Sequence, residues 1–459
     1  MFYEQDTIAA ISTAMGNAGI GIVRISGPQA IAAADRVYRS KSGKRLAEQK
    51  ANTIHYGYIK EGDELIDEVL VMLMKAPHTY TGEDTVEIDC HGGMLPLKKV
   101  LQEVLHAGVR AAEPGEFTKR AFLNGRIDLS QAEAVMDVIS AGSEYALKNS
   151  LGQLQGSVSR RVQSLREVLL YEIAYIESAL DDPEHISLEG YPEQLSEKLR
   201  PVQQETEQLL STADQGSLIR EGIRTVILGK PNAGKSSLLN ELSGREKAIV
   251  TDIAGTTRDI LEDTVDIGGI VLRLLDTAGI RESGDVIEQI GVERALQQAE
   301  DADLLLFVVD GSVPLDENDE RILELIRHRR ALVLLNKNDR ELVLSEELLA
   351  ERSGAPVFSI SARTGRGIGQ LKEKIRNMFF EGDISFDDQV LITSMRHVQA
   401  LQRCRDSLAL VQQSIAAGMP EDFFSIDLTD AYEALSSILG EAVGEDVVNE
   451  IFSRFCTGK

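Results

Sequence analysis

A phosphate-binding loop is predicted by the residues from Gly229 to Ser236, which read GKPNAGKS. Gly229 and Gly234 allow the backbone to wrap around a phosphate chain, so that successive N–H groups and the start of the following helix face the anion. Lys235 then reaches the outer phosphates, and the hydroxyl of Ser236 is placed for Mg²⁺. Considered alone, the stretch could also be an ordinary glycine turn between a strand and a helix.

Three further motifs each follow an apolar run that indicates a β-strand. Residues 276–279 (DTAG) place a carboxylate where it can hold the Mg²⁺ shell and a glycine where it can contact a γ-phosphate. Residues 336–339 (NKND) end in an aspartate that can accept both N1–H and N2–H₂ of guanine, a donor pair that adenine lacks. Ser361 and Ala362 add a backbone contact for the guanine oxygen. The four motifs occur in the order typical of Ras-like GTPases, so the chain is predicted to bind GTP.

The loop after the phosphate-binding helix, residues 248–258, is expected to sense the γ-phosphate. Its Thr257 is the predicted second Mg²⁺ ligand beside Ser236, and Lys235 and Arg258 are predicted catalytic residues. The residues expected to contact the nucleotide are Asn232, Ala233, Gly234, Lys235, Ser236, Ser237, Thr251, Asp252, Ile253, Ala254, Gly255, Thr256, Asp276, Thr277, Ala278, Gly279, Asn336, Lys337, Asp339, Ser361, Ala362 and Arg363.

The glutamine that orients water in Ras-type hydrolysis is absent, because Ile280 follows the DTAG motif. Glu282, Asp285 and Glu288 lie shortly downstream in a glycine-bearing segment, and any of them could orient water through hydrogen bonds. Ordinary solvated surface charge is the alternative for each.

Length and composition limit the class of protein. At 459 residues the chain exceeds the size of one core, so two or three domains are expected. It has no apolar run long enough to span a membrane and no N-terminal signal pattern, which predicts a soluble cytosolic protein. Three widely spaced cysteines fit a reducing compartment. The net charge of −26 disfavours non-specific nucleic-acid binding, although a local basic patch could still hold a specific RNA.

The predicted fold is multidomain. An α+β domain (1–120) is indicated by strands near 7–11, 20–25, 53–59, 68–74 and 85–90 and by helices at 29–37 and 94–107. Helical patterns cover 130–180, as one long helix or a helical pair, and also 194–210, 389–415 and 428–455. The α/β GTPase domain (216–380) is therefore expected to be inserted into one all-α domain made of 121–215 and 381–459, with links at 213–222 and 381–388.

Several motifs outside the GTPase segment resemble the bacterial tRNA modification GTPase family MnmE (TrmE), within the TrmE-Era-Era-like group, over essentially the full length. The stretches that carry the resemblance are GIGIVRISG (19–27), YTGED (80–84), HGG (91–93), PGEFT (114–118), RAFLN (120–124) and the terminal FCTGK (455–459). Thr457 departs from the isoleucine usual in that ending.

The resemblance implies a chemistry beyond GTP hydrolysis. The family adds a carboxymethylaminomethyl or aminomethyl group to C5 of the tRNA wobble uridine, together with a flavin-dependent partner, MnmG (GidA). The N-terminal domain resembles the family's tetrahydrofolate-binding domain, where a reduced folate (5-formyl- or 5,10-methylene-tetrahydrofolate) carries the one-carbon unit. The matching folate residues are Arg24, Glu87, Arg126 and Lys459.

The resemblance also implies how water and charge are handled in hydrolysis. Glu288 matches the family residue that orients the attacking water. A K⁺ ion replaces the arginine finger, and its matching ligands are Asn232, Thr251, Ile253 and Thr256. We therefore expect a K⁺-activated GTPase that is a homodimer through its N-terminal domain. The alternatives are a ribosome-assembly GTPase that binds rRNA, which the acidic helical C-terminal part disfavours, and a nucleotide-gated scaffold without folate.

Overall fold

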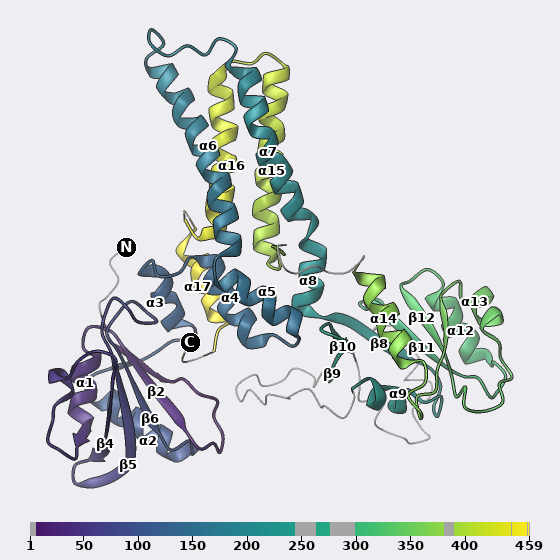
Figure 1. The fold of residues 1–459 in the computed structure, drawn as a ribbon, viewed down its shortest axis with the longest axis horizontal. Helices are drawn as coiled ribbons and strands as arrows, with labels where there is room; N and C mark the ends of the chain where they lie inside the picture. Colours follow the sequence, from purple (N-terminus) through teal and green to yellow (C-terminus); the bar gives the residue numbers. More distant parts are fainter. Residues whose placement is uncertain are drawn as a thin grey trace.

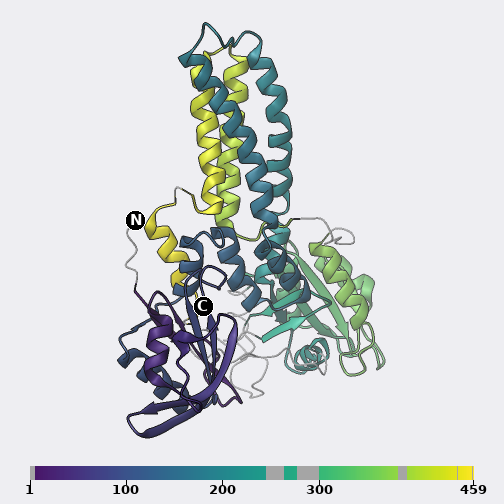
Figure 2. The same ribbon diagram turned by 60° about the vertical axis from the view of Figure 1, so that its left-hand side comes forward.

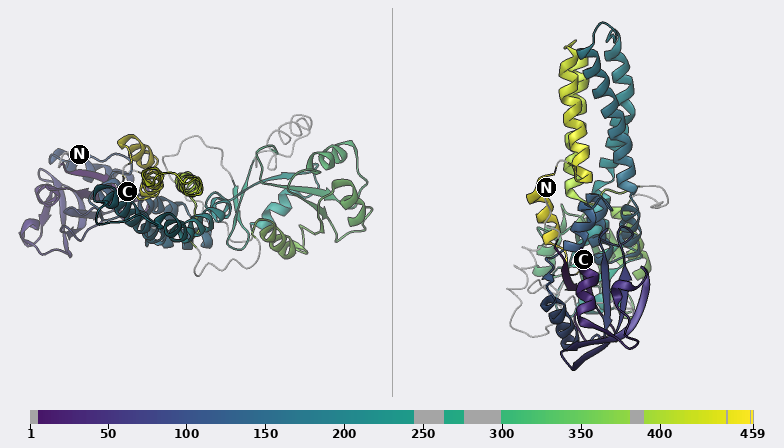
Figure 3. Two further views of the ribbon diagram at one scale, coloured as in Figure 1. Left: turned by 90° about the horizontal axis from the view of Figure 1, so that it is seen from above. Right: turned by 90° about the vertical axis from the view of Figure 1, so that its left-hand side faces the viewer.

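The computed structural model describes residues 6–243, 263–275, 299–380, 390–441, 443–456 and 458. They form an N-terminal sheet domain, an elongated helical domain and a second sheet domain (Figure 1). Seen from above, the two sheet domains lie at opposite ends of the molecule, with the helices between them (Figure 3). The predicted multidomain fold class is confirmed.

The N-terminal domain is built on a seven-stranded sheet in the order β3-β4-β5-β6-β2-β1-β7. Only β1 and β7 pair in parallel. The predicted strands and helices are present, whereas β3 and β7 are too short, at 3 and 2 residues, to give a sequence pattern. The elements are β1 (Ile8–Ile11), β2 (Gly21–Ser26), α1 (Ala30–Val37), β3 (Tyr38–Ser40), the 3-10 helix η1 (Leu46–Glu48), β4 (Thr53–Glu61), β5 (Glu64–Met74), β6 (Thr85–Cys90), α2 (Met94–His106), β7 (Arg110–Ala111) and α3 (Glu116–Leu123).

The two faces of this sheet are covered differently. Val23 and Ile25 point into a core that α1 and α2 close. Because successive side chains of a strand point to opposite faces, Arg24 lies on the other face. There Phe117 of α3 packs with Ile8, so α3 covers the part of this face near β1 and β2.

The helical domain is a four-helix bundle that stands away from both sheets (Figure 2). It consists of α6 (Ser157–Asp181), α7 (Tyr191–Ser211), α15 (Met395–Ala416) and α16 (Glu421–Leu439). Leu165, Leu199, Leu408 and Phe424, one from each helix, belong to a single core. Helices before and after the GTPase segment therefore share one core, and the GTPase domain is inserted between them, as predicted.

Two predicted helical segments are wrong in extent, because each is divided into shorter helices. Residues 130–180 form three helices: α4 (Leu129–Ser140), α5 (Glu144–Leu154) and α6. The side chain of Ser143 caps α5, and Gly156 precedes α6 at φ 82°. Residues 428–455 are divided into α16 and α17 (Glu445–Ser453). Gly440 ends α16 at φ 90°, where an added Cβ would lie 2.7 Å from the ring of Phe122. Apolar spacing alone does not reveal such glycine breaks.

The GTPase domain contains a six-stranded sheet in the order β13-β12-β11-β8-β10-β9. Only β9 is antiparallel to its neighbour. Helices α9 and α14 cover one face of the sheet, and α12 and α13 cover the other. The elements are β8 (Ile223–Leu228), α9 (Lys235–Leu242), β9 (Asp263–Asp266), β10 (Val271–Leu274), β11 (Leu304–Asp310), α12 (Glu317–Ile326), β12 (Ala331–Asn336), α13 (Glu346–Ser353), β13 (Val357–Ser359) and α14 (Ile368–Phe379).

The predicted link at 213–222 is a helix, α8 (Ala213–Glu221), that leads directly into β8. Arg220 of α8 forms an ion pair of 2.9 Å with Asp137 of α4. An added Cβ on Gly216 would lie 2.1 Å from the carbonyl oxygen of Ile392, so the two chain crossings into the GTPase domain lie side by side. The second predicted link, residues 381–388, lies outside the described residues.

Candidate functional site

The phosphate-binding loop leaves β8 and enters α9. Gly229 and Gly234 have φ angles of 140° and 106°, which only glycine adopts readily. The Nζ of Lys235 donates hydrogen bonds to the carbonyl oxygens of Gly229 (2.6 Å) and Lys230 (2.7 Å), and burial lowers its pKa from the ordinary value. The loop thus surrounds a cationic side chain, as phosphate binding requires.

The side chain of Asn336, at the end of β12, joins this loop to residues 361–363, here called the guanine-recognition loop. The Nδ2 of Asn336 donates to the carbonyl oxygen of Ala233 (2.7 Å), and its Oδ1 accepts from the backbone N–H of Ala362 (2.9 Å). An added Cβ on Gly234 would lie 2.1 Å from that Nδ2. Gly234 is therefore required for this contact.

The predicted guanine-binding carboxylate lies at the same sheet edge. Asp339 accepts a hydrogen bond of 2.8 Å from the hydroxyl of Ser361, and the guanidinium of Arg363 is 3.3 Å away. The hydrogen bond from Ser361 and the charge of Arg363 lower the pKa of Asp339. An ionised carboxylate has only acceptor oxygens, as recognition of the guanine N1–H and N2–H₂ requires.

Two groups of contacts that hold these loops were not predicted from the sequence. Lys230 forms ion pairs with Asp316 (2.7 Å) and Asp319 (2.5 Å) at the start of α12. Lys337, at φ 66°, pairs with Asp310 at the end of β11 (2.5 Å). The D-x-x-D spacing of Asp316 and Asp319 could have signalled a helix start, but not the lysine that binds there.

Twelve of the predicted nucleotide residues lie in described segments, from the loop (232–237) and from the ends of β12 (336, 337 and 339) and β13 (361–363). Asn232, Ser236 and Ser237 are exposed around the loop. The remaining predicted GTPase residues lie outside the described residues: Thr251, Asp252, Ile253, Ala254, Gly255, Thr256, Thr257, Arg258, Asp276, Thr277, Ala278, Gly279 and Glu288.

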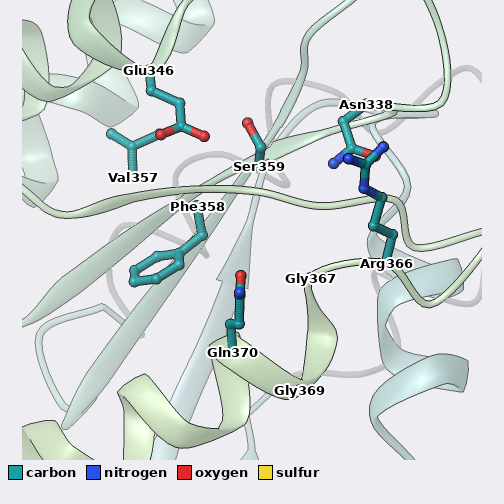
Figure 4. Close-up of a pocket in the computed structure, with 9 residues that line it drawn as sticks. All are labelled: Asn338, Glu346, Val357, Phe358, Ser359, Arg366, Gly367, Gly369 and Gln370. Carbon is teal, nitrogen blue, oxygen red and sulfur yellow. The ribbon is translucent and has the colours of Figure 1, made fainter.

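A pocket of about 600 Å³ lies beside the guanine-recognition loop, at the open edge of β13 (Figure 4). None of the predicted nucleotide residues lines it, although Asn338 is the neighbour of Asp339. Its lining consists of Asn338, Glu346, Val357, Phe358, Ser359, Arg366, Gly367, Gly369 and Gln370. The pocket is therefore separate from the predicted nucleotide site.

A second polar cluster lies in the N-terminal domain, on the sheet face that α3 covers. Arg24 of β2 and Glu87 of β6 are opposite each other in the ladder, and the Nε of Arg24 lies 2.7 Å from the carboxylate of Glu87. The Arg24 guanidinium also lies over the rings of Tyr80 (5.4 Å) and Phe117 (5.6 Å). Arg126 lies over the same Tyr80 ring at 5.2 Å.

The described part of the C-terminal tail reaches this cluster. Phe455 packs with Leu129, and the N–H of Gly115 donates to the carbonyl oxygen of Cys456 (3.3 Å). The carbonyl oxygen of Gly458 accepts from Arg24 (3.4 Å). The structure thus brings Arg24, Glu87 and Arg126 together, while the fourth predicted residue, Lys459, lies outside the described residues. The two aromatic rings of this cluster were not predicted, because they have no charge or spacing signal in the sequence.

Two features are absent from the described residues. Among residues 6–243, 263–275, 299–380, 390–441, 443–456 and 458, no group of three or more His, Cys, Asp or Glu side chains is arranged to hold a metal ion. No helix within those segments is long and apolar enough to cross a membrane.

Comparison with known proteins covers both ends of the chain. The family model described as "GTP-binding protein TrmE N-terminus" matches residues 7–126, and the model described as "MnmE helical domain" matches residues 129–456. The tRNA modification GTPase MnmE of Lachnoclostridium phytofermentans is 56% identical over 457 residues, covering 99% of this chain and all of that protein. The MnmE of Bacillus subtilis is 46% identical over 459 residues, with the same coverage.

Solved structures match part of the chain. The G domain of the T. maritima FeoB iron transporter is 30% identical, covers 33% of this chain and 96% of that one, and gives a TM-score of 0.26. The full-length relatives decide the family. With more than half of the chain matched by one family model and relatives aligned from end to end, the chain belongs to the MnmE (TrmE) family of tRNA modification GTPases.

Proposed function

We propose that this chain hydrolyses GTP to GDP and phosphate and that hydrolysis drives modification of C5 of the tRNA wobble uridine. The observation that carries the GTPase part is the double contact of Asn336, which joins the phosphate-binding loop to the guanine-recognition loop. Family membership supports the tRNA part, since the relatives are named as tRNA modification GTPases.

The described part of the nucleotide site fits the proposed ions in donor type. Mg²⁺ would be held by the hydroxyl of Ser236, with Thr257 as the second protein ligand, because Mg²⁺ prefers oxygen donors. K⁺ would be held by the exposed side chain of Asn232 together with Thr251, Ile253 and Thr256. When bound, K⁺ would supply positive charge that stabilises the charge developing on the phosphates during hydrolysis. Lys235 contributes its own charge to the outer phosphates.

The water that attacks the γ-phosphate is proposed to be oriented by Glu288. Glu288→Ala is expected to leave nucleotide affinity near the parent value and to slow hydrolysis by at least about a hundredfold, as for loss of a positioned acid–base group. Glu282→Ala and Asp285→Ala are the matched controls, and both should have a milder effect. Reduced GTP affinity with unchanged turnover would contradict this role.

The second cluster is proposed to bind a reduced folate. Its residues fit such a ligand: Glu87 can accept from the amino group of a pterin, and the guanidinium groups of Arg24 and Arg126 can hold the glutamate carboxylates. Both guanidinium groups lie over the ring of Tyr80. The folate would supply the one-carbon unit, and Lys459 is proposed as a further contact from the tail.

The proposed assembly is a homodimer that works in the cytoplasm with the flavin-dependent partner MnmG. An exposed apolar group on β4 and β5 supports self-association through the N-terminal domain. Tyr56 and Leu70 are opposite each other in the ladder, and Ile54 follows on the same face of the sheet. Their exposed fractions are 44%, 45% and 61%. Such apolar exposure on one sheet face is typical of a protein interface.

The experiment that tests the proposed function is a comparison of GTP hydrolysis by the full chain in KCl and NaCl at equal ionic strength. Hydrolysis should be faster in KCl, because Na⁺ does not replace the proposed K⁺ ligand set equally well. In the same salts, labels on the two GTPase domains of a dimer should approach each other with GDP–aluminium fluoride only when K⁺ is present. Equal rates and equal label distances in both salts would overturn the K⁺ proposal.

A further inference from the structure

Residues 36–50 form a strongly basic stretch, here called the basic segment, in a chain whose net charge is −26. It contains six cations and one carboxylate, Glu48. The cations are Arg36, Arg39, Lys41, Lys44, Arg45 and Lys50, and all six residues are exposed. The segment is therefore a local region of positive charge on a molecule whose net charge is negative.

The fold leaves most of these charges available. Arg45 is paired with Asp35 at 2.9 Å. Lys41, Lys44 and Lys50 form no ion pair with any residue in the described part of the chain. Unpaired surface lysines in an acidic protein are a feature that attracts an anionic partner.

Local hydrogen bonds shape the segment after β3 and before β4. The N–H of Gly43 donates to the carbonyl oxygen of Ser40 (3.2 Å), which turns the chain after β3. The hydroxyl of Thr53 donates to the carbonyl oxygen of Lys50 (2.6 Å) at the start of β4. His55 also lies on β4, and its partial burial together with the charge of Lys44 lowers its pKa.

The basic segment is connected to the proposed folate cluster through the end of β5. The Nζ of Lys75 donates to the carbonyl oxygen of Gln49 (3.0 Å), which ties the segment to the end of β5. Tyr80 follows Lys75 by five positions, and an extended chain of that length spans at most about 18 Å. A strand of RNA that crosses the segment can therefore also reach the cluster where the one-carbon unit is proposed to be held.

We infer that the basic segment binds the phosphate backbone of the tRNA next to the nucleotide that is modified. The inference rests on the proposed function, since it takes tRNA as the substrate. Phosphates favour clustered Lys and Arg, and the short chain connection from Lys75 to Tyr80 favours RNA over an acidic protein as the occupant. The remaining acidic surface would keep RNA away from other parts of the molecule, so binding would be local.

The test measures binding of fluorescently labelled tRNA that carries a wobble uridine to the full-length protein, by anisotropy at 50 and 200 mM KCl. The variant is Lys41→Glu/Lys44→Glu/Lys50→Glu. The control, Lys98→Glu/Arg321→Glu/Arg327→Glu, reverses three exposed cations elsewhere and changes the net charge equally. Comparison of the variant with the control distinguishes loss of a local contact from a general increase in electrostatic repulsion. A milder Lys41→Gln/Lys44→Gln/Lys50→Gln variant serves if the first does not fold.

The basic-segment variants are expected to bind tRNA at least tenfold more weakly at 50 mM KCl, whereas the control should retain most of the affinity. The slope of log K against log[KCl] should also become less steep by about 2 to 3, since each lost phosphate contact removes about 0.7 to 0.9 from that slope. GTP hydrolysis should be unchanged in all variants, so failure here is distinguishable from failure of the proposed function. Equal weakening by variant and control, or unchanged tRNA binding as expected for an acidic protein partner, would overturn the inference.

Discussion

The Nδ2 of Asn336 lies 2.7 Å from the carbonyl oxygen of Ala233, so the strand that ends in the guanine-recognition motif is bonded directly to the phosphate-binding loop. The same side chain accepts from Ala362 (2.9 Å). A buried amide that satisfies two backbone groups fixes their relative positions, because leaving either group unpaired is costly. The segments predicted to recognise the base and to bind phosphate are therefore joined through one residue.

Gly234→Ala should disrupt this coupling. The added methyl group would lie 2.1 Å from the Nδ2 of Asn336, at a φ of 106° that alanine does not readily adopt. Loss of the buried hydrogen bond is expected to weaken GDP and GTP binding at least about tenfold. Gly369→Ala in α14 is the control, since nothing lies within 4 Å of its added Cβ. Titration with a fluorescent guanine nucleotide tests both, and parent-like binding by Gly234→Ala would contradict the account.

Asp339→Asn should change the base preference from guanine toward xanthine. The substitution replaces an acceptor pair by one donor and one acceptor, which no longer matches the guanine N1–H and N2–H₂. We expect GTP affinity to fall roughly tenfold to hundredfold while xanthosine triphosphate binding improves. Ser361→Ala, which removes only the hydroxyl that bonds Asp339, should be milder. Unchanged GTP affinity in Asp339→Asn would count against the assigned guanine pocket.

Arg24→Ala should weaken binding of 5-formyltetrahydrofolate at least about tenfold, because the side chain carries a charge-assisted contact to Glu87 and lies over Tyr80. Isothermal calorimetry on the full-length protein measures the effect. Arg160→Ala is the matched control, since among the residues that the structure describes its exposed guanidinium bonds only the nearby carbonyl oxygen of Gln155. Equal affinity in Arg24→Ala and the control would remove the cluster from consideration as a folate site.

The buried ion pairs of Glu133 should make the helical domain acid-sensitive. Burial alone would raise the pKa of Glu133, but its ion pairs with His397 (3.0 Å) and Arg396 (2.8 Å) lower the pKa overall. Because the folded pKa is depressed, Glu133 stabilises the fold above its unfolded pKa, and this contribution is lost as pH falls through the acid range. At pH 7, Glu133→Gln should cost about 3–5 kcal/mol in the free energy of unfolding.

Urea unfolding followed by circular dichroism measures this difference. The gap between parent and Glu133→Gln should be largest near pH 7 and should shrink as the pH falls below 4.5. Glu197→Gln is the control, because its ion pair with Arg200 lies on the surface (2.7 Å) and contributes little. A gap that does not change with pH would show that ionisation of Glu133 is not the cause.

The fold could be predicted from the sequence wherever a pattern is local. The apolar runs before the loop at Gly229 and before Asn336 predict β8 and β12, and the helical stripes on both sides of the GTPase segment predict one shared bundle core. The breaks at Gly156 and Gly440 could not be predicted, because they depend on positive φ angles and on contact with Phe122.

The candidate site, like the fold, could be predicted only where the pattern in the sequence is local. The nucleotide motifs are contiguous, so their residues could be named from spacing alone. The contacts that hold them, such as Lys230 with Asp319 and Lys337 with Asp310, join segments far apart in the chain. Likewise, Tyr80 and Phe117 meet Arg24 only through the pairing of β2 with β6 and the packing of α3.

The central claim is that GTP hydrolysis by this chain drives wobble-uridine modification of tRNA. Its most direct test is mass spectrometry of tRNA nucleosides from cells that lack the protein and are complemented with the parent chain, Gly234→Ala or Gly369→Ala. We expect the modified wobble uridine to be absent from the deletion strain, restored by the parent chain and by Gly369→Ala, and not restored by Gly234→Ala. An unchanged nucleoside profile in the deletion strain, or full restoration by Gly234→Ala, would contradict the account.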